Sequence, residues 1–422
     1  MLLRSCQITD LDGPYDGQTL DLRIENGTIT EMAAGLEARA GEPVHDLAGA
    51  HVSPGFIDLG AYLGDPGHEE REDIASLRAA ALAGGYVAVG VLPNTEPVRQ
   101  SVADVAYLLR QNGTAATDLL PMAALSKDLA GKDLTEMLDL DRAGALLFTD
   151  GPYRYTSTSL LKRGLEYARI RQCTIMVSPY DERLVSEGQM HEGEVSTRLG
   201  LPGIPVLSEI LPLKVVVELL AYTGGKLIVH LLSSAEGVAE VRRAKALGLN
   251  LRATVSAHHL QFTDGALAGF DPNFKMLPPL RTESDRQALI EGLADGTIDC
   301  IVSNHVARHG EEKELEFPYA DFGALGLQTA FRQSLLALEG RLSLAEIVAK
   351  FTAGPRLLLN DPTLHLRSGA QIGLTVFTPT APAEEFTLAD LVGKTTNSPL
   401  LGQHLPGRIE GVVHNGAFHP VT

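Results

Sequence analysis

The sequence predicts an α/β fold, a (β/α)8 TIM-type barrel with a small β-sandwich domain built from both termini. Between residues 53 and 365, short apolar runs alternate with helical segments, which indicates a parallel sheet covered by helices. About eight such units fit this length, as a closed barrel requires. Outside this region, apolar and polar residues alternate, which is typical of half-exposed strands.

The two ends of the chain share this strand-like texture. The run LDLRIENGTITEM contains Glu25-Asn26-Gly27, a hairpin signal, and the runs AQIGLTVFTP and GRIEGVVHNGAFHP follow residue 365. We therefore expect residues 1–52 and 366–422 to form one composite β-domain. Residues 53–365 then form the barrel.

In the central region, strands are predicted by runs that are rich in β-branched residues. They include YVAVGVLPN, ALLFTDG, CTIMVSP, KLIVHLL, LRATVSA and DCIVSNH. The helical segments between them often end in glycine, as KVVVELLAYTGG does. A doubly wound open sheet is the alternative architecture. No GxGxxG motif follows an early strand, which weakens a nucleotide-binding interpretation.

Composition restricts the partners and the location. The formal net charge of -18 argues against nucleic acid or an anionic membrane as a partner. No run approaches the ~18 apolar residues of a membrane helix. The cysteines Cys6, Cys173 and Cys300 are sparse and far apart, which favours a reducing compartment. We expect a cytoplasmic protein.

Several long motifs of the central region resemble segments of the dihydroorotases, in the same order along the chain. They are LPNTEP (92–97), GEVSTRLGLPGIP (193–205), AHHLQFTD (257–264) and LPPLRTESDRQALIEGLADGTIDCIVSNH (277–305). The sequence is therefore similar to the class I dihydroorotases of the amidohydrolase superfamily. The resemblance implies a barrel with a zinc site at the carboxyl ends of its strands.

The positions that the resemblance assigns to metal binding have largely lost their ligands. They are Gly60, Tyr62, Asp150, Ser178, Leu231 and Asn304. The family's first strand ends in His-x-His, where this chain has Gly60 and Tyr62. Only Asp150 keeps a ligand-type carboxylate. A catalytic zinc needs about three protein ligands, so we expect no metal and no cofactor at this site.

The positions that bind substrate and move protons in the family are also changed. Asn304 replaces the aspartate that serves as general base, and an amide takes up no proton at neutral pH. Gly64 replaces the arginine expected to hold a substrate carboxylate, and Leu277 replaces an asparagine. Asn94 is retained. We therefore expect no catalytic residue.

The remaining polar candidates are expected either near the pocket or on the surface. His230 precedes Leu231, so strand alternation predicts that it points away from the pocket. His258, His305 and His309, with Asn94, are possible residual pocket residues. His191 is expected in a surface loop. The acidic run 68–73 is expected to be a solvated helix start.

The resemblance implies a place in de novo pyrimidine biosynthesis. Some members of the family lack the metal histidines and act as non-catalytic partners of aspartate transcarbamoylase, so we expect that role, together with homo-oligomer formation. One alternative is an active dihydroorotase or cyclic amidohydrolase that interconverts N-carbamoyl-L-aspartate and dihydroorotate with zinc at a non-standard site. Another is a metal-free small-molecule sensor.

Overall fold

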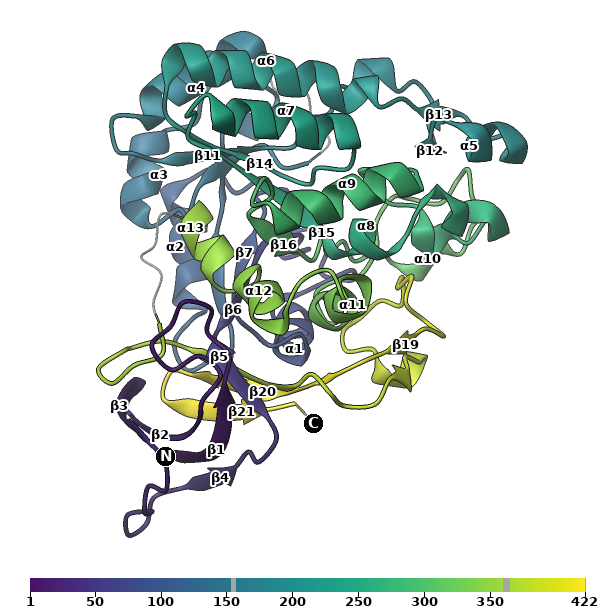
Figure 1. Ribbon diagram of the computed structural model, residues 1–422. Coiled ribbons are helices and arrows are strands. Elements are labelled where there is room, and N and C mark those ends of the chain that lie inside the picture. The colour runs from purple at the N-terminus through teal and green to yellow at the C-terminus, as the bar shows by residue number, and fades with distance from the viewer. Residues whose placement is uncertain (153–156, 360–364, 422) are drawn as a thin grey trace.

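A barrel of parallel strands forms the centre of the computed structural model, which describes residues 1–152, 157–359 and 365–421 (Figure 1). One sheet has the order β6-β7-β8, and another has the order β9-β10-β11-β14-β15-β16. Only Met122 separates β8 from β9, so these two share one strand position. The strands are β6 (Phe56–Ala61), β7 (Tyr86–Val91), β8 (Asp118–Pro121), β9 (Ala123–Ala124), β10 (Phe148–Thr149), β11 (Thr174–Val177), β14 (Lys226–Val229), β15 (Leu251–Ser256) and β16 (Cys300–Val302).

The barrel closes where its last strand meets its first. Directly after β16, the backbone N–H and the hydroxyl of Ser303 donate to the Asp58 carboxylate of β6, at 2.7 and 2.6 Å. The N–H of Tyr62 also donates to the carbonyl of His305 at 3.1 Å. An open sheet would keep its edge strands apart, so the doubly wound alternative is wrong and the barrel is confirmed.

Helices cover the outside of the barrel (Figure 1). Asp73, Ser101 and Ser234 cap α1, α2 and α7 by accepting N–H groups of the first turn. The larger helices are α1 (Ile74–Ala83), α2 (Val102–Arg110), α3 (Met137–Ala143), α4 (Thr158–Ala168), α6 (Leu207–Thr223), α7 (Ala235–Ala246), α9 (Glu283–Ala294), α11 (Ala330–Ala337), α12 (Leu344–Ala349) and α13 (Ala353–Leu358). Shorter elements lie between them: α5 (Glu194–Leu199), α8 (Ala257–Gln261), α10 (Gly310–Lys313), β12 (Met190–His191) and β13 (Gly203–Ile204).

Apolar side chains pack against both faces of the barrel strands. One buried cluster includes Leu59, Met122, Met176, Ile228 and Val302, which come from strands all around the barrel. A larger cluster packs the strands against the surrounding helices. Strands buried on both faces read as continuous apolar runs, which explains the pattern seen in the sequence.

Both ends of the chain contribute to one eight-stranded sheet, with the order β21-β20-β17-β5-β1-β2-β3 and β4 paired with β1. The hairpin between β2 and β3 turns at Asn26 and Gly27, both with positive φ, as the sequence predicted. The predicted boundary at residue 52 falls within β5, and the one at residue 365 directly follows residues 360–364, which lie outside the described residues. The strands are β1 (Leu2–Ile8), β2 (Thr19–Glu25), β3 (Thr28–Ala33), β4 (Val44–Asp46), β5 (His51–Pro54), β17 (Leu374–Thr378), β20 (Arg408–His414) and β21 (Ala417–Pro420); β18 (Glu384–Glu385) and β19 (His404–Leu405) pair separately.

Across the described residues, none of the helices has the length and apolar character needed to cross a membrane.

Candidate functional site

The positions singled out by the sequence lie at or just beyond the carboxyl ends of the barrel strands. Gly60 is the second-to-last residue of β6, and Tyr62 follows that strand. Asp150 follows β10, Ser178 follows β11, and Asn304 lies two residues after β16. Active sites of (β/α)8 barrels are built at this end of the barrel.

The imidazole of His230 occupies the space beside Gly60. A Cβ atom added to Gly60 would lie 2.6 Å from Nε2 of His230 and 2.8 Å from its Cε1. His230 follows β14, which is not a neighbour of β6 in the sheet order. Two strands that are not neighbours meet only through the barrel interior, so the ring points inward.

The expectation that His230 points away from the pocket is therefore wrong. Strand alternation does not apply, because β14 ends at Val229 and Leu231 has a φ of +61°. The hydroxyl of Thr254 fixes the turn: it accepts the N–H of Leu231 at 3.0 Å and lies 2.9 Å from Nδ1 of His230.

His230 is held as a neutral ring. Burial lowers the pKa of its imidazole to about 3, because a charged group loses its hydration in the interior. Its Nε2 has no hydrogen-bond partner among the described residues.

Apolar side chains fill the barrel around this ring. Leu231 is 2% exposed and belongs to the same buried cluster as Leu59, Met122 and Met176, and Tyr62 packs against that cluster. Two of the family's ligand positions therefore contribute hydrocarbon or an aromatic ring to the packing.

Asp150, the surviving carboxylate, is bound to a neighbouring loop. Its Oδ1 accepts the N–H of Ser126 and its Oδ2 accepts the Ser126 hydroxyl, both at 2.7 Å. The amide of Asn94 donates to the backbone carbonyl of Asp150 at 3.2 Å. Both retained polar residues thus hold the loops that follow β7, β9 and β10.

Asn304 donates a hydrogen bond that a carboxylate cannot make. Its Nδ2 lies 3.0 Å from the carbonyl oxygen of Leu277, with the Asn304 backbone at a φ of +49°. An ionised aspartate at this position accepts only, so the amide suits its surroundings as the family's aspartate would not.

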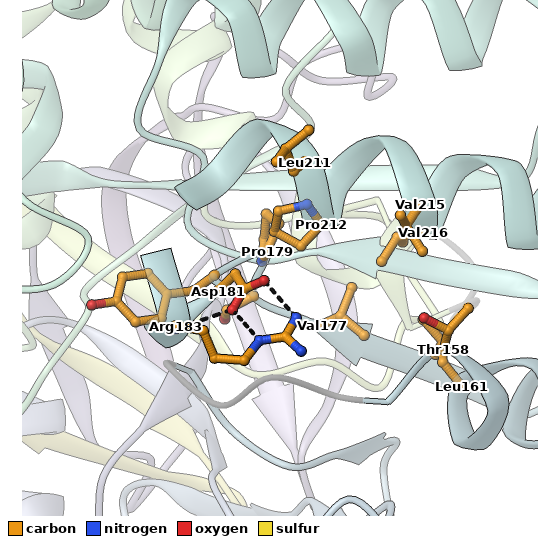
Figure 2. Close-up of a pocket in the computed structure, with 12 residues that line it drawn as sticks. Thr158, Leu161, Val177, Pro179, Asp181, Arg183, Leu211, Pro212, Val215 and Val216 are labelled. Carbon is orange, nitrogen blue, oxygen red and sulfur yellow. Dashed lines mark hydrogen bonds and ion pairs between the residues drawn. The ribbon is translucent and has the colours of Figure 1, made fainter. Parts of the chain in front are cut away.

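Ser178 lies on the flank of the barrel, at a cavity of about 130 Å³ between β11, α4 and α6. Figure 2 shows this cavity, with Asp181 and Arg183 paired at one side and apolar side chains of α6 at the other. Ser178 thus lines a different space from the interior beside Gly60.

The position of the family's substrate-binding arginine is covered by backbone. A Cβ on Gly64 would lie 2.0 Å from the carbonyl oxygen of His68 and 2.7 Å from that of Glu72. The loop folds back on itself here, because the N–H of Gly64 donates to Glu72 at 3.0 Å. No larger side chain fits at residue 64 unless this loop moves.

The other histidines have structural contacts. Nε2 of His305 lies 2.8 Å from the buried Glu72 carboxylate, and the backbone N–H groups of Gly326 and Leu327 donate to its Nδ1. His309 is exposed at the start of α10. His258 lies buried in α8, and burial lowers the pKa of its imidazole to about 3.

Two expectations about polar surface residues are wrong. The acidic run does start a helix, with Asp73 as the cap, but Glu72 is only 3% exposed because it pairs with His305. His191 is also buried, with its Nδ1 3.2 Å from the guanidinium of Arg281. Both partners are distant in the sequence, so nothing in the local pattern indicates them.

The residues present do not fit a zinc ion at the family-type site. Asp150 is committed to Ser126, and no other family position offers a ligand-type side chain. His230 adds one imidazole nitrogen. Within residues 1–152, 157–359 and 365–421, no three His, Cys, Asp or Glu side chains come together as a metal-binding group. The requirement of about three protein ligands is not met.

The barrel, its β-domain and the position of the site define a protein of the amidohydrolase class. An L-hydantoinase (dihydropyrimidinase) from Arthrobacter aurescens has this fold, with a TM-score of 0.85 and 21% identity over 99% of this chain and 95% of that one. A D-hydantoinase (dihydropyrimidinase) from Thermus sp. gives a TM-score of 0.81 at 20% identity, over 99% and 94%. At these identities the likeness concerns the fold alone.

The sequence narrows this class to one family. Residues 49–237 match the family model described as Dihydro-orotase-like. The dihydroorotase of Geobacter sp. (strain M21) is 37% identical over 99% of this chain and 98% of its own length. That of Anaeromyxobacter dehalogenans (strain 2CP-C) is 37% identical over 99% and 96%. The chain belongs to the dihydroorotase family.

Proposed function

We propose that this chain is a non-catalytic dihydroorotase-family protein of pyrimidine biosynthesis that serves as a structural partner of aspartate transcarbamoylase chains. The observation that carries the loss of catalysis is the contact between His230 and Gly60. The His230 ring fills the space that the side chain of the family's first metal-binding histidine, at residue 60, would occupy.

Three independent requirements of the family reaction are unmet. Metal-bound water is the nucleophile available at neutral pH, since free water has a pKa of about 15.7, and the ligand set for that metal is missing. Asn304 cannot accept the proton that a general base must take. At residue 64, backbone occupies the space of the arginine that would hold the substrate carboxylate.

The partnership is supported by the family resemblance and by the packing. The barrel is complete and its interior is filled, so the replaced site leaves a scaffold able to fold and to present surfaces. We expect the chain to co-elute with the transcarbamoylase chain of the same organism, at a size above that of either alone. Separate elution of both at micromolar concentration would overturn the partnership but would leave the loss of catalysis standing.

An active dihydroorotase is the second candidate, favoured by one observation. His230 presents a buried Nε2 with no partner among the described residues, and a neutral imidazole is the form that binds zinc. This candidate predicts that His230→Gln lowers both zinc content and turnover. Our proposal predicts that the wild type already has neither bound zinc nor turnover, so that His230→Gln changes neither.

A further inference from the structure

The side chain of Lys313 ends in a cage of backbone oxygens. Lys313 is the last residue of α10 (Figure 1) and is only 5% exposed. Its Nζ donates to four carbonyl oxygens: those of Pro272 at 2.6 Å, Asp321 and Gly323 at 2.9 Å each, and Lys275 at 3.4 Å. Within the described part of the chain, every hydrogen bond of this group goes to a backbone carbonyl, which carries no net charge.

The cage replaces the water that the ammonium group loses. An ammonium group has three N–H donors and no acceptor. Burial lowers the pKa of Lys313 to about 7, and the positive charges of Arg308 and Lys275 act in the same direction against those of Asp271 and Asp321. Below that pH the group is a monovalent cation surrounded by carbonyl oxygens, the same ligands that replace the hydration shell of potassium in carbonyl-lined sites.

The four oxygens come from two loops at the carboxyl end of the barrel. Pro272 and Lys275 lie between β15 and α9, whereas Asp321 and Gly323 lie in the segment that follows β16 and α10. The first loop continues to Leu277, whose carbonyl accepts the hydrogen bond of Asn304. The cation therefore joins the two loops beside the altered family site.

We propose that these carbonyl oxygens form a monovalent-cation site, which the chain fills with its own Lys313 ammonium group to hold the loops after β15 and β16 together. Removal of Nζ should leave a site that takes an ammonium or potassium ion from solution. A cavity of about 280 Å³, lined in part by Pro272, Asn273, Arg308 and Lys313, lies beside the group and gives such an ion a path to the cage. The inference holds whether or not the chain is catalytic.

Urea unfolding of Lys313→Ala at pH 6 tests the proposal. The truncation leaves buried carbonyl oxygens without a donor, so the folded-to-unfolded ratio should fall by about tenfold or more in 0.1 M tetramethylammonium chloride, whose cation is too large for the cage. Ammonium or potassium chloride at the same concentration should raise that ratio again by about tenfold, as binding to the folded state with a Kd of about 10 mM implies.

Two variants are the controls. Lys350→Ala removes a half-buried lysine whose Nζ donates to one carbonyl oxygen, that of Ile298 at 3.2 Å, so its unfolding should be the same in all three salts. Lys313→Met keeps an apolar chain in the path of the ion and should gain nothing from ammonium. Equal unfolding of Lys313→Ala in the three salts, or an equal gain for Lys350→Ala, would overturn the proposal.

The wild type provides a readout that does not depend on whether a variant folds. Nitrogen-15 NMR at pH 6 should show Nζ protons of Lys313 that exchange slowly with water, because carbonyl oxygens accept all of them. Their contacts with the α-protons of Gly323 would identify them. Nζ protons of Lys313 that exchange as fast as those of an exposed lysine would overturn the proposal.

Discussion

The imidazole of His230 lies directly against the α-carbon of Gly60, across the barrel from its own strand. Gly60, which has no side chain, leaves space in the barrel interior, and the His230 ring fills that space. The two residues therefore form one packing arrangement. Restoring the family's histidine at residue 60 would therefore require His230 to move. The change at residue 60 is therefore coupled to the position of His230 and is more than the loss of one ligand.

Gly60→Ala should destabilise the protein strongly. The added Cβ meets the ring at 2.6 Å, and overpacking of this kind costs about 1–3 kcal/mol. The φ of +95° adds about 1 kcal/mol or more for a non-glycine residue. Urea unfolding measures the sum.

Gly17→Ala is the matched control for that measurement, because Gly17 also has a positive φ but nothing lies within 4 Å of its added Cβ. In a His230→Ala background the cost of Gly60→Ala should fall to that of Gly17→Ala. An unchanged cost in that background would show that the His230 contact does not exist.

Stability should decline as pH falls below about 6.5. Burial lowers the pKa values of His230 and His258 to about 3, and that of His259 to about 4. The unfolded chain takes up these protons near pH 6.5 while the folded chain does not, so unfolding is favoured between about pH 6.5 and 4. Each ring contributes up to about 1.4 kcal/mol per pH unit.

The free energy of unfolding, measured in urea at pH 7 and pH 5, should fall less steeply with pH in His230→Gln than in the wild type. The difference should correspond to at most one proton fewer taken up on unfolding. The control is His309→Gln, which replaces an exposed ring. An identical slope for wild type and His230→Gln would mean that the ring is not buried in its neutral form.

Asn304→Asp should lower stability at pH 7.5 without producing activity. The carboxylate would face the carbonyl oxygen of Leu277, which the amide now satisfies at 3.0 Å, and a lost buried hydrogen bond costs about 1–3 kcal/mol. A protonated carboxyl can donate, so the deficit relative to wild type should shrink at pH 5. Dihydroorotase turnover by this single variant would contradict the account.

Asp150→Ala and Ser126→Ala should both lower the free energy of unfolding, by about 1–3 kcal/mol each. Asp150→Ala removes both 2.7 Å hydrogen bonds, whereas Ser126→Ala removes only the one from the hydroxyl and keeps the one from the backbone N–H. Because the two variants share the hydroxyl bond, their effects should not add. Metal content, measured on the same samples, should be unchanged. Loss of bound zinc in Asp150→Ala alone would identify the carboxylate as a ligand.

The barrel, and the position of the family-matched residues at its strand ends, were predictable because they depend on local pattern and motif order. Continuous apolar runs indicated strands buried on both faces, and the motifs placed Gly60 and Asn304 at strand ends. The direction of His230 was not predictable, since it depends on the positive φ of Leu231 and on space left by a residue far away in the sequence. The pairing of Glu72 with His305 is long-range in the same way, so its burial was missed.

The proposed loss of the metal site is tested most directly by elemental analysis of protein purified with added zinc, paired with a dihydroorotase assay in both directions. We expect zinc far below one ion per chain and no conversion of N-carbamoyl-L-aspartate or dihydroorotate above the buffer rate. One zinc per chain with turnover would contradict the account.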